Sequence, residues 1–166
     1  MRTKKDLRHY LRQWKDRFPL AGIVLRKGQW FIGRAQSGEY EEAIQWRRKR
    51  NPQPQECYFN SQHFCSDCRV SRHFEGYLFI KGTPIEHAWA VMDDSKVVDH
   101  TIEALERKAE IDKSIPIETM TPLYYGVEVR RSFIMQQIVE NGAGRPLAER
   151  YYAVKTKRPV HRRQAF

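Results

Sequence analysis

The chain has little cysteine and no long apolar run, and each shortage argues against a class of protein. Three cysteines among 166 residues are too few, and odd in number, for a disulfide framework, which indicates free thiols in a reducing compartment. No stretch approaches the ~18 consecutive apolar residues of a membrane helix. No apolar segment follows the charges of residues 1–9 as it would in a secretory signal. We therefore expect a cytoplasmic protein without a membrane partner.

Negative charge is also in short supply. The 30 Lys and Arg exceed the 20 Asp and Glu, which gives a net charge of +10. Such a field attracts nucleic acid, acidic proteins or anionic surfaces. The basic residues concentrate in segments 4–5, 47–50 and 155–163, whereas residues 57–125 have no such excess of positive charge. The basic segments that could bind a partner are therefore treated separately from the residues that could carry out chemistry.

The length suits a single domain over residues 1–166. Apolar spacing predicts an N-terminal extension over residues 1–50, with helices at 4–18 and 37–50 and a β-hairpin at 23–33 between them. A proline-rich linker at 51–55 leads into the core. Residues 150–166 are expected to form a basic tail with a loose end.

The core, residues 52–129, reads as α+β: a helix followed by an antiparallel β-meander. The pattern predicts a helix over 56–68, strands over 74–80, 85–92, 97–100 and 123–129, a short helix or loop over 102–113, and a helix over 131–140. Asn141-Gly142 is a helix-ending signal.

Three residues in this core have the chemistry of a thiol enzyme, which needs a thiolate, a base and a group that orients the base. Cys57 begins a predicted helix, where the helix dipole and free amides favour an anion. His87 lies on the apolar face of a predicted strand. Asp99 follows twelve residues later, so a three-residue hairpin loop places both side chains on one face. If the loop is 93–95, Asp99 is diagonal to His87; if it is 92–94, the two face each other.

The order of these elements resembles the papain-like cysteine superfamily, and within it the transglutaminase-like branch. The matching stretches are residues 56–61, 75–77, 85–89, 97–101 and 124–126. The resemblance implies acyl transfer through a thioester, as in a peptidase, amidase, deamidase or acyltransferase. It implies Cys57, His87 and Asp99 as the triad, a peptide or protein substrate and no cofactor, and the positive field favours acidic substrates.

Three further residues are candidates for binding the substrate. In the papain branch a glutamine just before the cysteine supports the oxyanion, and the resemblance therefore suggests Gln53 or Gln55. Trp89, two residues after His87 on the same strand face, is either core packing beside the site or a platform for substrate.

A non-catalytic, basic nucleic-acid-binding module is the alternative. Cys65 and Cys68 form a C-x-x-C pair, which with Cys57 and either His63 or His73 supplies enough ligands for a zinc site. Aromatic residues are interleaved with Arg and Lys near both ends of the chain, as in surfaces that stack bases and hold phosphates. Nucleic acid therefore stays open as a partner.

Overall fold

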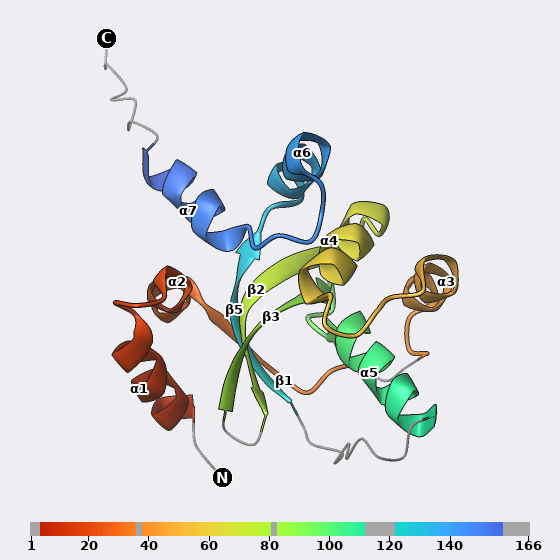
Figure 1. The fold of residues 1–166 in the computed structure, drawn as a ribbon, viewed down its shortest axis with the longest axis horizontal. Coiled ribbons are helices and arrows are strands. Elements are labelled where there is room, and N and C mark those ends of the chain that lie inside the picture. Colours follow the sequence, from red (N-terminus) through yellow and green to blue (C-terminus); the bar gives the residue numbers. More distant parts are fainter. Residues whose placement is uncertain (1–3, 36–37, 81–82, 112–121, 158–166) are drawn as a thin grey trace.

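The protein is α+β, as the sequence predicts, and is shown by a computed structural model that describes residues 4–35, 38–80, 83–111 and 122–157. Helices surround one antiparallel sheet (Figure 1). The helices are α1 (Lys4–Trp14), α2 (Pro19–Lys27), α3 (Glu41–Arg50), α4 (Cys57–Asp67), α5 (His100–Ile111), α6 (Arg131–Asn141) and α7 (Ala148–Lys157). The strands are β1 (Gln29–Ile32), β2 (Ser71–Ile80), β3 (Thr83–Met92), β4 (Val97–Val98) and β5 (Leu123–Val129).

The sheet has the strand order β1-β5-β2-β3-β4, and every neighbouring pair is antiparallel. Its two edges approach each other, because the Ala35 amide, just beyond β1, donates a 2.7 Å hydrogen bond to the carbonyl of Val97 in β4. The sheet is therefore curled, with an inner and an outer face.

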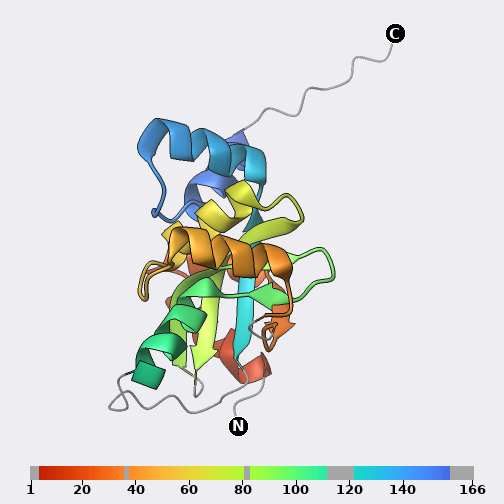
Figure 2. The ribbon, with the colours of Figure 1, turned by 90° about the vertical axis from the view of Figure 1, so that its right-hand side faces the viewer.

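Each face of the curled sheet has its own apolar core. The inner face is filled by its own side chains, chiefly Phe74, Leu78, Trp89, Val91, Val97 and Tyr124. On the outer face, α1, α2 and α7 pack over the β2–β5 half, and α4, backed by α3, packs over β3 and β4. Figures 1 and 2 show these two helical groups on opposite sides.

Two glycines allow the sheet to curl. Gly76 of β2 pairs with Gly126 of β5. A Cβ on Gly76 would lie 2.3 Å from the Tyr125 carbonyl oxygen, and one on Gly126 would lie 2.4 Å from the Trp89 ring. Real Cβ atoms do not approach other atoms so closely, so any side chain here would force the strands apart.

The predicted hairpin over residues 23–33 is wrong. Residues 19–27 form α2, which begins with Pro19 at its first turn and buries Leu20, Ala21 and Val24 against the sheet. Proline suits the first turn of a helix, and tertiary burial outweighs the β propensity of Ile23 and Val24. β1 pairs instead with β5, about a hundred residues along the chain.

Most other elements agree with the sequence pattern. Cys57 is the first residue of α4, and α6 ends at Asn141 before Gly142, which has φ 76°. The predicted tail is wrong in part, because residues 148–157 form α7 with Tyr151 buried; its end, residues 158–166, lies outside the described residues. His100 begins a helix rather than ending a strand. Within the described ranges, no helix is long and apolar enough to cross a membrane.

Gly126→Ala is predicted to destabilise the fold by about 1–3 kcal/mol or more, because its methyl group overlaps the Trp89 ring. Urea denaturation would measure the change. Gly22→Ala in α2 is the matched control, since its methyl group would be in ordinary contact at 3.4 Å and alanine favours helix by about 0.5–1 kcal/mol. Equal destabilisation by both substitutions would contradict the role given to Gly126.

Candidate active site

Cys57 is held at the start of α4 by a buried asparagine one turn later. The Asn60 amide donates to the Gln53 carbonyl (2.8 Å) and to the Thr101 hydroxyl (2.9 Å), which joins the preceding loop to α5. The Asn60 backbone N–H bonds the Glu56 carbonyl, so the amides of residues 57–59 precede the helical hydrogen-bond ladder. The half-buried Cys57 thiol therefore lies beside donors suited to an anion.

His87 lies on β3 where the sheet has a gap. β4 ends at Val98, opposite Ala90, so no strand pairs with β3 at His87 on that side. On the other side His87 faces Gly76 of β2, which has no side chain. The imidazole is only 5% exposed, but the short β4 leaves space in which α4 and α5 reach it.

Asp99 orients the imidazole and begins α5 at the same time. Its Oδ2 accepts hydrogen bonds from His87 Nε2 (2.8 Å) and from the Tyr124 hydroxyl (2.9 Å). Its Oδ1 accepts from the backbone N–H groups of Thr101 (3.2 Å) and Ile102 (3.1 Å), as a helix N-cap does. The β3–β4 register corresponds to a 93–95 loop, so Asp99 is diagonal to His87.

The electrostatics favour a protonated His87. Burial lowers the pKa of the imidazole, but the charge and hydrogen bond of Asp99, followed by those of Cys57, outweigh burial and raise the pKa to about 10. Burial also raises the pKa of the Asp99 carboxyl, yet the charge of His87 and hydrogen bonds from His87, Ile102 and Tyr124 bring it below its usual value. Since Nε2 bonds Asp99, Nδ1 is the ring atom left for the sulfur.

The thiol opens into a pocket of about 390 Å³ lined by residues 55–59 and by Gly144. Gly144 belongs to the loop between α6 and α7, which buried Gln62 holds against α4. Gln62 accepts from the Gly144 N–H (2.9 Å) and donates to the Arg145 carbonyl (2.6 Å). The pocket wall therefore comes from two segments more than eighty residues apart.

A series of buried hydrogen bonds also holds the end of the α6–α7 loop against β2. Ser61 of α4 bonds His73 Nδ1 (2.7 Å), and His73 Nε2 bonds Glu75 (2.9 Å). Glu75 in turn accepts from the Leu147 and Ala148 backbone N–H groups at the start of α7. The side chains of His73 and Glu75 are fully enclosed, so this series anchors α4 and α7 to β2 and does not face substrate.

Of the three predicted substrate-binding residues, only Gln55 lines the pocket, with φ 70°. Gln53 is exposed and donates to the Asn51 carbonyl (2.8 Å), so its amide is already used in a turn. Of the two roles predicted for Trp89, the substrate platform is wrong and core packing holds, because the side chain is 1% exposed and packs against Phe74 and Tyr124 in the inner core. Its role is to support the strand that carries His87.

The residues of the alternative zinc site do not converge. Among the described residues, no group of three or more His, Cys, Asp and Glu is arranged to hold a metal ion. Cys57 and Cys65 lie eight residues apart on α4, about 12 Å along the helix axis. His73 is engaged by Ser61 and Glu75. Burial raises the pKa of the Cys65 thiol to about 12, which opposes its ionisation as a ligand.

Sequence reasoning gave no role to Tyr124 or Gln62. Tyr124 is fully buried and donates to Asp99 from β5. Strand alternation puts Tyr124 on the face of Gly126, but only the β2–β5 pairing brings this face to His87. Gln62 carried a weaker signal, because a glutamine in the middle of an apolar helix face requires a partner when buried.

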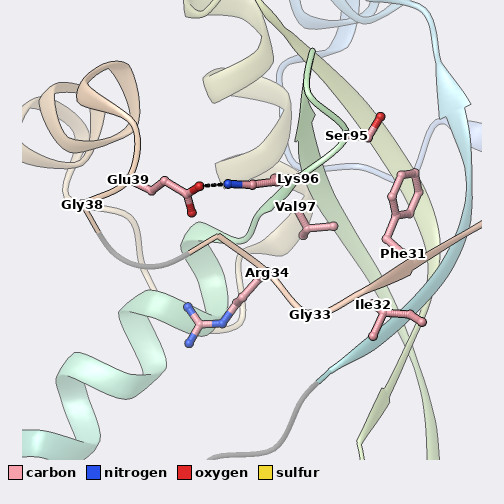
Figure 3. A pocket seen from close by; sticks show the side chains of 9 residues that line it. All are labelled: Phe31, Ile32, Gly33, Arg34, Gly38, Glu39, Ser95, Lys96 and Val97. Carbon is pink, nitrogen blue, oxygen red and sulfur yellow. Dashed lines mark hydrogen bonds and ion pairs between the residues drawn. The ribbon is translucent and has the colours of Figure 1, made fainter.

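A second, larger pocket of about 700 Å³ lies where the edges of the curled sheet meet (Figure 3). It is lined by residues 31–34, 38–39 and 95–97. Lys96 pairs with Glu39 inside it, and Arg34 pairs with Glu106 of α5. Its lining includes no member of the Cys57, His87 and Asp99 group, and its cations already have carboxylate partners.

Comparison of the chain with protein-family models, with curated proteins and with solved structures finds no match. The geometry around Cys57 is therefore what points to a function.

The His87–Asp99 pair predicts how stability varies with pH. Because the pKa of His87 rises from its ordinary value near 6.5 to about 10, its stabilisation is complete below pH 6.5 and is lost as the pH rises toward 10. The pKa of the Asp99 carboxyl is lowered in the folded protein. The ionised carboxylate therefore stabilises the fold at pH values above the ordinary pKa of aspartate, and this stabilisation is lost on acidification. His87→Gln should cost roughly 3 kcal/mol near pH 6, and less near pH 10.

Urea denaturation of both proteins across this pH range would measure the difference. His9→Gln is the control, because His9 is exposed on α1. A His87→Gln cost that stays constant from pH 6 to pH 10 would contradict a charged His87.

Proposed function

We propose that the protein is a thiol-dependent acyl-transfer enzyme that works through an acyl-enzyme on Cys57. The observation that carries the proposal is the His87 ring, which bonds Asp99 through Nε2 and whose pKa the Cys57 thiol helps to raise. A nucleophile, a base and an orienting carboxylate in this order are the components of thiol catalysis. The arrangement supports the papain-like, transglutaminase-like resemblance of the sequence.

In the first half of the proposed reaction, the thiol proton resides on His87, and the sulfur attacks a substrate carbonyl carbon. The carbonyl electron pair moves to oxygen, which the Cys57 backbone N–H and the Gln55 side chain, both at the pocket, stabilise in this proposal. When the oxyanion collapses, the bond to the leaving group breaks. His87 gives its proton to that group, and a thioester stays on Cys57.

In the second half, water or an amine attacks the thioester carbon and gives a proton to His87. The carbon–sulfur bond breaks, and the sulfur leaves as a thiolate. Asp99 holds the Nε2 side of the ring throughout, which leaves Nδ1 for the proton exchange with the sulfur. Hydrolysis and transfer differ only in whether water or an amine enters the pocket beside Gly144.

The carboxylates near the pocket support a substrate that presents an amide or an amine. Glu56 lines the pocket, and Glu86 accepts a 2.8 Å hydrogen bond from the Tyr58 hydroxyl at its edge. Phe59, 42% exposed, provides an apolar wall. This lining favours a peptide-like carbonyl over an anionic group next to the thiol, in contrast to the acidic substrate that the net charge suggests.

The proposal predicts that a thiol-directed electrophile at neutral pH modifies Cys57 much faster than Cys65 or Cys68, which are buried. Intact mass with peptide mapping would locate the adduct. His87→Asn should slow modification of Cys57 by about 10²-fold or more, because the thiol then lacks its proton acceptor.

Asp99→Asn should slow modification of Cys57 as well, and Asp93→Asn in the exposed β3–β4 turn is the matched control that should not.

The same proteins treated with an activated ester should show a transient acyl adduct that is absent from Cys57→Ser. An added amine should shorten the lifetime of this adduct if transfer is the reaction. Equal modification of all three cysteines would refute the proposal.

A further inference from the structure

The helices α1, α2 and α7 carry most of the net charge of the protein. Residues 4–27 and 148–155 contain ten Lys and Arg against three Asp and Glu, which accounts for seven of the ten net positive charges. These helices pack together on the outer face of the sheet, on the side opposite α3 and α5 (Figure 1). We call the exposed Lys and Arg of this layer the basic face.

Lys and Arg side chains of the basic face lie close to one another. Arg26 of α2 lies beside Lys15, since both surround Gly22. Lys27 and Lys155 both lie over the Tyr152 ring, with their Nζ atoms 5.3 and 5.6 Å from its centre. In the part of the chain that the structure describes, no carboxylate forms an ion pair with Lys15 or Arg26.

The basic helix α3 shows the contrast. Arg47 pairs with Glu103 at 2.9 Å, and Arg50 pairs with Asp67 at 3.0 Å. Arg47 and Arg50 are therefore neutralised within the fold, whereas no ion pair among the described residues neutralises Lys15 or Arg26. Clustered like charges destabilise a fold, and an external anion would relieve this repulsion.

Aromatic rings accompany these cations. Tyr10, Trp14 and Phe18 form a ladder with ring centres 4.7 and 5.4 Å apart, and Phe18 at its end is 44% exposed. Cations beside exposed rings suit nucleic acid, because phosphates meet the charges and bases stack on rings. The apolar side of α1, with Leu7 and Leu11, faces the core and is not available to a lipid surface.

We propose that the basic face of α1, α2 and α7 binds nucleic acid, at a surface separate from the thiol pocket. The phosphate backbone provides most of the affinity, so added salt weakens binding steeply. The surface does not depend on the chemistry of Cys57.

The test is fluorescence anisotropy of the full chain with labelled single-stranded DNA, single-stranded RNA and duplex DNA of about 20 nucleotides. Salt is varied from about 50 to about 200 mM. Lys15→Glu/Arg26→Glu should weaken binding at least about tenfold and lower the salt slope on single strands by about 1.4. Phe18→Ala should weaken single-strand binding without changing the slope, because the ring has no charge.

Arg48→Glu/Lys49→Glu on α3 makes the same change in net charge at exposed positions and should have little effect. Circular dichroism confirms that each variant is folded, and Lys15→Gln/Arg26→Gln replaces the reversal if it is not. Equal losses from the two charge reversals would overturn the proposal in favour of diffuse attraction. Binding of poly-glutamate but of no nucleic acid would overturn it in favour of an acidic protein. Cys57→Ser should bind as the unchanged protein does, which separates this proposal from the enzymatic one.

Discussion

At the centre of the sheet, β2 and β5 approach each other at Gly76 and Gly126 with no space for a side chain on either. The Trp89 ring lies against Gly126, where it fills the inner core and fixes β3. Two residues earlier on the same face, His87 has Gly76 as its neighbour across the strands. Gly126 and Gly76 therefore form a row of paired positions without side chains that ends at His87. The arrangement of the candidate site follows from this row.

The end of β4 completes this arrangement. Because the strand stops at Val98, Asp99 turns away from the sheet, and its two carboxylate oxygens serve different elements. One bonds His87 and Tyr124, and the other begins α5. Helix capping and the orientation of a histidine are commonly treated as competing explanations for an aspartate, but here a single carboxylate caps α5 and orients the His87 imidazole. Moving this side chain would thus disturb the helix and the imidazole together.

The sequence predicts those parts of the protein whose contacts are local. His87 and Asp99 could be brought together from the chain alone because only a three-residue turn separates their strands. Cys57 could be placed at a helix start because residues 51–55 exclude a helix before it. The run Ile23-Val24 wrongly predicted a strand, because burial within α2 overrides its β propensity. The Tyr124 bond and the Gln62 clamp require long-range pairings that no periodicity in one sequence encodes.

The clamp between Gln62 and the loop at Gly144 and Arg145 has a consequence for synthesis on the ribosome. Translation proceeds from the N-terminus, so Cys57, His87 and Asp99 have all been made while the pocket wall is still missing. The nascent chain exposes its sulfur without a shaped cavity until residues 144–148 emerge and dock on α4 and β2. Under the proposed function, selectivity would thus be the last property the molecule acquires, and a prematurely terminated chain would retain a thiol without the enclosure that restricts what it meets.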